Sequence, residues 1–377
     1  MNSFWRGCVQ FYKRTDRLLL LLCLVCSAVS GYMLWGIYLS GYIKFRVLVT
    51  QLLATFLGFS GACLLSAFDY RSLANLWKLY MPGSLGLVAL TYVIGIQRYD
   101  YIDDKAWLQI PFTSATVQPS EILKLAFIFS FALHLEKAKD SVNNPKTLLA
   151  LCLHGALPAL MVMGQGDHGT AMVFVFIFAA MLFAAGLQLR YVAGAILSAV
   201  VASPFAWFFI LDNDKRGRIM TVFNPAADPT GVGWQQNLGM TAIGSGQIWG
   251  KGVLTGSHQY IPEMHNDFIF SFIGEAGGFV GCSAVILLLA VLCVLLLLNA
   301  RRAKDPLGCF ICVGVFGMIA FQSIWVIGMC LSLLPVAGIT LPLFSAGGTS
   351  VVLTWAGIGM VLGVHRHSHV GLFDEHL

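Results

Sequence analysis

Ten long apolar segments, each of about 20 residues or more, follow one another along this chain of 377 residues. An α-helix needs about 20 mostly apolar residues to cross the roughly 30 Å hydrocarbon core of a membrane. The segments lie near 17–38, 46–67, 76–95, 120–136, 147–163, 169–186, 190–211, 267–299, 306–332 and 345–365. Because lipid cannot hydrogen-bond to a bare backbone, this pattern predicts an all-α polytopic membrane protein with about ten transmembrane helices in one bundle.

The composition agrees with a lipid environment, since 58% of the residues are apolar and only 11% are charged. Soluble domains average about 45–50% apolar and about 25% charged residues, so this chain would expose large apolar patches in water. A soluble enzyme is therefore excluded, and so is a basic nucleic-acid binder despite the net charge of +5. No internal repeat or polar linker divides the chain, which predicts a single domain over residues 1–377.

Most of the 23 lysines and arginines flank the segments on the side that holds both ends of the chain. Cytoplasmic loops of membrane proteins carry an excess of these residues, so we expect both termini in the cytoplasm. Residues 212–266, between the seventh and eighth segments, would then form a large outer loop. The first segment exceeds the apolar core of a signal peptide, and further segments follow it, so we expect it to remain as a span.

Charged side chains at membrane depth are costly and usually functional, and one group of them begins the fourth segment. Pro119 and Ser120 suit the first turn of a helix, where proline loses no hydrogen bond and serine can cap. Glu121 and Lys124 are three residues apart, so they share a helix face and can pair. Two interpretations stay open: a structural ion pair at a helix start, or the wall of a polar cavity that opens outward.

A polar turn of residues 164–171 separates the fifth and sixth segments. Its Asp167 is expected to cap the helix that follows. A lone histidine such as His168 is more often a hydrogen-bonded residue than a metal ligand.

The outer loop holds a basic cluster, Lys215 to Arg218, and the glycine-flanked Lys251. Arginine forks onto phosphate, and glycine lets backbone N–H groups approach an anion, so this loop is a candidate site for an anionic headgroup. Gly250-Lys251-Gly252 is not a P-loop, because the required spacing and the Ser or Thr are missing.

Asp267 opens the eighth apolar segment and is therefore expected at a helix N-terminus near the outer membrane surface. It is either a plain N-cap or a general base that is already ionised. Glu263 lies four residues before it and Glu275 eight residues after it, so all three carboxylates would approach one face of a continuous helix.

Two cysteine pairs, Cys23/Cys26 and Cys309/Cys312, lie within apolar helices and are expected to pack in the core. The alternating His365, His367 and His369 form only a weak metal signal.

Taken together, these motifs resemble those of the SEDS family (shape, elongation, division and sporulation), which includes RodA, FtsW and SpoVE. The matching stretches are Gln118 to Glu121 with Lys124, Gln165 to Ala171, Arg218 to Pro225, Ala242 to Gly246, Pro262 to Phe270, Gly274-Glu275 and Leu334 to Ser350. They occur in the family's order along nearly the whole chain.

The resemblance implies a ten-span peptidoglycan glycosyltransferase of the bacterial cytoplasmic membrane with its active site facing outward. Such enzymes polymerise lipid II, a disaccharide-pentapeptide on undecaprenyl pyrophosphate, and work with a class B penicillin-binding protein that cross-links the product. The chain itself lacks the Ser-x-x-Lys motif of those cross-linking enzymes. A divalent cation, Mg²⁺ or Mn²⁺, is the one candidate cofactor, and no nucleic-acid partner is expected.

The resemblance also implies roles for individual residues. Asp267 matches the family's essential aspartate and would take the proton of the attacking sugar hydroxyl. Trp107 would pack against sugar or lipid, or anchor the chain at the membrane interface. The candidate substrate-binding residues are Lys124, Glu121, Arg216, Arg218, Lys251, Trp107, Glu263, Gln118, Ser345, Gly347 and Gly348, with the cations among them facing the diphosphate.

The chain departs from the family pattern at five places, namely Ala106, Gly166, His168, Val326 and Ala346. The first removes an arginine before Trp107, which Lys105 is placed to replace. Gly250-Lys251-Gly252 with Gly256, and Val336 to Gly338 without a lysine, look more like RodA and favour an elongation role. Two other functions remain alternatives: a lipid II flippase, and a non-catalytic scaffold for a transpeptidase.

Overall fold

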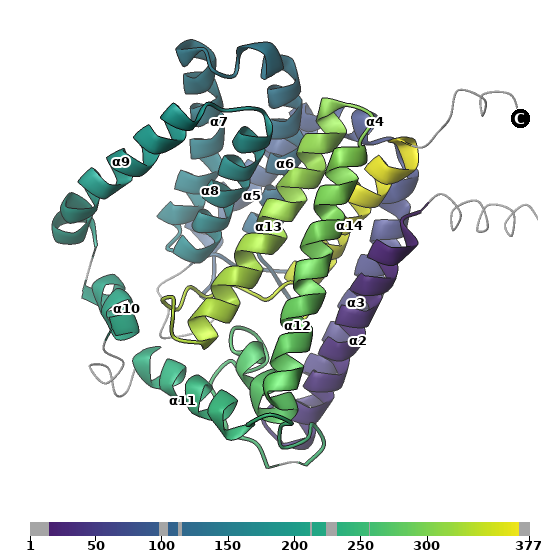
Figure 1. Ribbon diagram of the computed structural model, residues 1–377, viewed down its shortest axis with the longest axis vertical. Coiled ribbons are helices and arrows are strands. Elements are labelled where there is room, and N and C mark those ends of the chain that lie inside the picture. Colours follow the sequence, from purple (N-terminus) through teal and green to yellow (C-terminus); the bar gives the residue numbers. More distant parts are fainter. Residues whose placement is uncertain are drawn as a thin grey trace, which may run out of the picture.

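The structure is a computed structural model that describes residues 15–97, 105–111, 115–211, 213–223, 232–255 and 257–368. Asn224-Pro225, Gly256 and His369 of the sequence analysis lie outside these residues. The described chain forms one helical bundle (Figure 1).

Ten long helices stand at the ten predicted positions, with ends within three residues of those expected except that α9 ends at Phe205, six residues before the predicted end at 211. They are α2 (Arg17–Leu39), α3 (Phe45–Ala67), α5 (Trp77–Ile94), α6 (Pro119–Ala138), α7 (Pro145–Gly164), α8 (His168–Ala184), α9 (Leu189–Phe205), α12 (Ile269–Arg302), α13 (Pro306–Cys330) and α14 (Gly348–Ser368). Seven of the helices in the described chain are long and apolar enough to cross a membrane, and α8 is a shorter apolar helix. α5, of 18 residues, and α6, which carries charges near both ends, are not among these seven helices. The predicted polytopic helical membrane fold is confirmed.

Small residues and aspartate caps explain much of the local structure. Asp16, Asp167 and Asp305 accept backbone N–H bonds at the starts of α2, α8 and α13. α3 and α14 pack closely because a Cβ at Gly359 would lie 2.6 Å from the Cα of Ala62. Close backbone approach at small residues is how membrane helices associate without a hydrophobic driving force.

Hydrogen bonds place both ends of the described chain at the same end of the bundle. The Asn299 side chain, near the end of α12, donates to Asp16 at the start of α2 at 2.8 Å. Its oxygen lies 2.7 Å from Nδ1 of His365, near the end of α14. Asp267, just before α12, therefore lies at the opposite end. This arrangement agrees with an even number of spans, while the cytoplasmic side stays a prediction from the basic residues.

The predicted outer loop, residues 212–266, is not all loop. It contains α10 (Asn213–Phe223) and α11 (Val232–Ser245), and α11 packs beside α12. α9, which leads into this region, has no buried residue among those described, and Figure 1 shows it at the edge of the bundle. A two-stranded hairpin, β1 (Leu108–Gln109) and β2 (Thr116–Val117), precedes α6. The remaining short elements are α4 (Tyr70–Asn75), the 3₁₀ turn η1 (Lys139–Ser141) and the π turn η2 (Ala206–Ile210).

α12 is 34 residues long because it consists of two helical parts joined at Gly278, whose φ of 64° and ψ of −161° are not helical. A kink leaves backbone groups without helical partners. Here the amides of Phe279 and Val280 donate to the carbonyls of Gln247 and Ile248, at 2.8 and 3.1 Å. The stretch that follows α11 therefore replaces the hydrogen bonds that the kink breaks.

Candidate active site

A cavity of about 1020 Å³ lies at the end of the bundle opposite the described chain ends. Helices α6, α8, α10 and α11, the segment before α12, and residues 335–340 all contribute to its wall. Its charged and amide-bearing lining residues are Gln118, Glu121, Asp167, His168, Lys215, Arg218, Gln235, Glu263, Asn266, Asp267 and Gln322. Glu121 therefore lines a cavity that carries charged and amide side chains, and it also forms the ion pair with Lys124 at the start of α6.

Asp267 faces this cavity from the turn that leads into α12. Of the two alternatives for Asp267, the plain N-cap does not hold, because α12 begins at Ile269 and Phe268 occupies the N-cap position without a side-chain bond. The chain before it turns tightly: the amides of Asn266 and Phe268 both donate to the carbonyl of Glu263. Glu263 itself has a φ of 57°, an uncommon backbone conformation for a residue with a side chain.

Residues far along the chain hold this turn from outside. Ser345 Oγ donates to the Asn266 carbonyl at 2.7 Å, and the Ala346 amide donates to the His265 carbonyl at 2.8 Å. The Cys330 thiol donates to the Asp267 carbonyl at 3.6 Å. The backbone on which Asp267 stands is thus hydrogen-bonded at three successive residues.

The Glu121–Lys124 pair exists as predicted, with Lys124 Nζ 2.7 Å from Glu121 Oε1 and both side chains buried. Glu121 lines the cavity, whereas Lys124 lies behind it and does not. Pro119 is in the first turn of α6 as expected. The N-cap is Gln118 rather than Ser120, and the buried Ser120 hydroxyl has no hydrogen bond within the described chain.

The turn at residues 165–168 joins the starts of α6 and α8. Gln118 Nε2 donates to Asp167 Oδ2 at 2.8 Å, and Asp167 Oδ1 accepts from the Thr170 amide, which confirms the predicted cap. Burial raises the pKa of the Asp167 carboxyl, and the neighbouring Glu121 carboxylate adds to the effect. A Cβ at Gly169 would lie 2.1 Å from the Ala337 carbonyl oxygen, so α8 touches the 335–340 wall directly.

The basic cluster on α10 divides between two environments. Lys215 and Arg218 line the cavity, whereas Arg216 donates to the Phe208 carbonyl at 3.1 Å. A second cavity of about 320 Å³ adjoins the first and is lined by Lys105, His168 and Lys215 among others. Lys105, next to Ala106, where the family arginine is missing, therefore lines the same cavity as Lys215 of α10.

Seven of the twelve candidate residues from the sequence line the main cavity: Asp267, Glu121, Arg218, Trp107, Glu263, Gln118 and Gly347. Five do not: Lys124, Arg216, Lys251, Ser345 and Gly348. Lys251 instead pairs with Glu275 at 2.6 Å. Glu275 is fully buried away from the cavity, so the expectation that Glu263, Asp267 and Glu275 share one face is wrong.

Several residues that line the cavity are not among the twelve candidates from the sequence. Lys215 belongs to the basic cluster but was not chosen, and a polar Gln322 within an apolar span is a signal that could have been used. Trp325, whose Nε1 donates to the Pro335 carbonyl at 3.1 Å, gave no such signal.

Comparison with known proteins shows the family. A family model that describes the cell cycle proteins FtsW, RodA and SpoVE matches residues 13–370. This chain belongs to that family. The predicted SEDS membership is thereby confirmed.

Curated relatives carry names of one activity. The chain is 33% identical over 329 residues to the probable peptidoglycan glycosyltransferase FtsW of Geobacter metallireducens, covering 85% of each chain. It is 32% identical over 293 residues to the peptidoglycan glycosyltransferase MrdB of Escherichia coli K12, covering 75% of this chain and 77% of that one. Since division-type and rod-type relatives match almost equally, the elongation role stays a prediction.

Solved structures share the fold. One, described as structural coordination of polymerization and crosslinking by a peptidoglycan synthase complex, matches with a TM-score of 0.81 and 28% identity over 95% of this chain and 99% of that one. The rod shape determining protein RodA of Thermus thermophilus matches with a TM-score of 0.70 and 25% identity over 95% of this chain and 98% of the other.

Proposed function

We propose that this multi-pass membrane protein, a peptidoglycan glycosyltransferase by family and relatives, polymerises lipid II at the outer face of the bacterial cytoplasmic membrane with Asp267 as its general base. The observation that carries the proposal is the position of Asp267 on a cavity that Lys215 and Arg218 also line. The sequence-based prediction of the activity agrees with the names of the relatives.

The reaction needs a base because a sugar 4-hydroxyl attacks an anomeric carbon and must lose its proton. A carboxylate within hydrogen-bond reach performs this step. Asp267 suits it because its backbone is fixed by bonds from Cys330 and, through the neighbouring Asn266, from Ser345. Such fixation keeps the base in place without reorganisation during the reaction.

The leaving group is a lipid diphosphate, and its departure builds negative charge. Lys215 and Arg218 line the main cavity, and Lys105 lines the adjoining one. Fixed cations near the departing oxygen lower the barrier of such a step. We assign the diphosphate to this α10 side of the site and the sugar acceptor to the Asp267 side.

The lipid chain requires an apolar exit towards the membrane. Leu160 and Met163 of the apolar helix α7 line the cavity and are 63% and 44% exposed. We propose that the lipid chain leaves the cavity past these two side chains. Their exposure supports lateral entry of a lipid-linked substrate.

We propose Glu263 and Asp267, whose side chains line the same cavity, as the carboxylates that would hold a divalent cation. Mg²⁺ commonly binds through one or two carboxylates together with substrate phosphates. In the described chain, no group of three or more acidic, histidine or cysteine side chains lies together as a set of metal ligands. When bound, the ion would offset phosphate charge.

The partner we expect is a class B penicillin-binding protein, which would cross-link the glycan. The relationship to a structure described as a peptidoglycan synthase complex supports an assembly of this kind.

The test is polymerisation of lipid II by the purified protein with and without its partner. Asp267→Asn should abolish polymer, whereas Asp140→Asn, an exposed carboxylate at the other end of the bundle, should not. Equal polymer from the native protein and Asp267→Asn would refute the base assignment. Transfer of lipid II across vesicles without any polymer would instead favour a flippase.

A further inference from the structure

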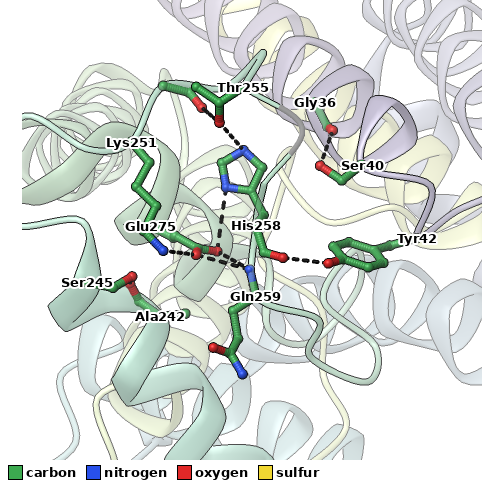
Figure 2. Close-up of polar contacts among 11 residues, drawn as sticks. Gly36, Ser40, Tyr42, Ala242, Ser245, Lys251, Thr255, His258, Gln259 and Glu275 are labelled. Atoms are coloured by element: carbon green, nitrogen blue, oxygen red, sulfur yellow. Dashed lines mark hydrogen bonds and ion pairs between the residues drawn. The ribbon is translucent and has the colours of Figure 1, made fainter.

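A second polar cluster lies beside the kink of α12, outside the cavity. Its centre is Glu275, whose side chain has no exposed area. Lys251 Nζ donates to Glu275 Oε1 at 2.6 Å, and the backbone amide of Gln259 lies 3.0 Å from both carboxylate oxygens. Figure 2 shows these donors converging on one carboxylate from a single loop.

A buried carboxylate is costly unless several donors satisfy it. Glu275 has two donors, the Lys251 ammonium and the Gln259 amide, whose N–H is shared between both carboxylate oxygens, and both come from the loop between α11 and the Asp267 turn. Breaking these contacts would leave the buried Glu275 carboxylate without these donors, so the loop conformation and the Glu275 side chain depend on each other. The sequence had placed Lys251 at the substrate, but its ammonium is already held at this carboxylate.

Backbone hydrogen bonds also connect this loop to α12 beside Glu275. The amides of Lys251 and Gly252 donate to the carbonyls of Glu275 and Ala276, both at 2.9 Å, just before the kink. Gly252, with a φ of 90°, turns the loop away towards His258.

His258 forms the next contact of the cluster. Its side chain is fully buried, and its Nδ1 lies 3.6 Å from Glu275 Oε2 without any hydrogen-bond partner. The backbone carbonyl of His258 accepts a bond of 2.5 Å from the Tyr42 hydroxyl, which stands between α2 and α3. Figure 2 shows Glu275 and Tyr42 on opposite sides of this short stretch.

The loop is thus held at two places, one before Glu263 and one between Glu263 and Asp267. Glu275 and Tyr42 fix its backbone at residues 258–259, and Ser345 fixes it again at Asn266. Glu263 lies between these anchors, and Asp267 directly follows the second. The six intervening positions include Glu263 in its left-handed conformation, which needs such support.

We infer that Glu275 is a positioning residue, whose carboxylate clamps the Gln259 amide and thereby sets where Glu263 and Asp267 stand in the cavity. Glu275 itself touches neither substrate nor reacting atoms. The inference rests on the proposed function of Asp267 and assigns the support of that site to a cluster that does not line the cavity.

The test compares Glu275→Ala with Glu275→Gln in the full-length protein. Glutamine keeps an oxygen for the Gln259 amide but not the charge, whereas alanine removes the acceptor. We expect Glu275→Ala to lower the turnover of lipid II at least tenfold and to speed hydrogen exchange of residues 253–268. Exchange in α3 and α13 should stay unchanged, and Glu275→Gln should recover most of both losses.

A second variant guards against a general loss of folding in Glu275→Ala. Tyr42→Phe removes the other bond to the 258–259 stretch without touching the buried charge, and should speed exchange of residues 257–260 with a smaller loss of turnover. The inference would be overturned if folded Glu275→Ala kept native turnover while Tyr42→Phe and Glu275→Gln kept both native turnover and native exchange. A uniform rise of exchange across all helices in Glu275→Ala, with no recovery in Glu275→Gln, would also overturn it, because the role would then be only structural.

Hydrogen exchange tests this inference independently of the proposed function. If the native protein makes no polymer, the proposed function fails. Faster exchange confined to residues 253–268 in Glu275→Ala would still support the clamp.

Discussion

Ser345 Oγ donates a hydrogen bond of 2.7 Å to the backbone carbonyl of Asn266, the residue immediately before Asp267, across 79 positions of sequence. The same hydroxyl accepts from the Leu341 amide at 2.8 Å. Ser345 therefore joins the loop that precedes α14 to the turn that carries the proposed base. The sequence placed this serine at the substrate, and the structure gives it a supporting role behind the cavity wall.

Replacing Ser345 tests this support. Ser345→Ala leaves the buried Leu341 amide and Asn266 carbonyl short of a partner, which should cost about 1–3 kcal/mol of unfolding free energy. Polymerisation should fall with it, because Asp267 follows the freed carbonyl. Ser323→Ala is the matched control, since Ser323 is also buried but bonds only to Ile319 within its own helix. A Ser345→Ala protein with native thermal midpoint and native activity would contradict the support role.

The Glu121–Lys124 pair should behave as a unit. Removing one partner from a buried ion pair leaves an uncompensated charge and typically costs about 3–5 kcal/mol. We expect Lys124→Met or Glu121→Gln alone to lower the thermal midpoint in detergent markedly, and the double variant to recover most of the loss. Additive losses in the double variant would show that the two side chains do not depend on each other.

Helix positions were predictable from the sequence because the length of an apolar run is a local property. The Glu121–Lys124 pair and the Asp167 cap were predictable for the same reason, since three-residue spacing fixes both contacts. The partners of Lys251, Glu275 and Ser345 were not predictable, because each partner lies on a different element from the residue that it contacts. The sequence could not decide whether Asp267 is an N-cap, because bonds from α13 and the loop before α14 shape its turn, not its own helix.

Two further features could not be predicted from the sequence, for physical reasons. α11 was assigned to a loop because its three interior glycines, Gly233, Gly239 and Gly244, weaken the helical pattern. Gly239 is required by packing, since a Cβ there would lie 2.8 Å from Ser271 Oγ. The kink at Gly278 needs the stretch of residues 247–252 as a partner, which no local pattern reveals.

Asp167 gives the fold a pH dependence of defined sign. Because burial, with help from Glu121, raises the pKa of its carboxyl, the folded state binds a proton more tightly than the unfolded state does. Its contribution to stability is therefore full below the ordinary aspartate pKa of about 3.9 and is lost as the pH rises through the raised value. Asp167→Asn keeps an oxygen for the Thr170 amide and removes the charge.

We expect Asp167→Asn to be at least as stable as the native protein at neutral pH, with the difference shrinking as the pH falls. Thermal midpoints measured over a pH series in one detergent check this. A variant that is less stable than the native protein at the alkaline end, and equally stable at the acid end, would reverse the sign and contradict the argument.

Gly169 tests the contact between α8 and the cavity wall. Alanine there would place its Cβ against the Ala337 carbonyl and force backbone shifts that typically cost about 1–3 kcal/mol. Gly194→Ala is the control, because nothing lies within 4 Å of a Cβ at this position of α9, and alanine should favour the helix by about 0.5–1 kcal/mol. Equal midpoints for the two variants would mean that the 335–340 segment moves away without cost.

The two arginines of α10 distinguish a cavity role from a merely basic surface. Arg218 lines the cavity, whereas Arg216, two residues earlier, donates to the Phe208 carbonyl. If Arg218 offsets charge on the leaving diphosphate, Arg218→Gln should lower turnover by about 10²-fold, the usual scale for losing one preorganised donor. Arg216→Gln removes the same charge from the same helix, yet it should lower turnover by less than tenfold because its guanidinium does not line the site. Initial rates of lipid II polymerisation at saturating substrate measure the difference, and equal losses in both variants would show that only the net charge of α10 matters.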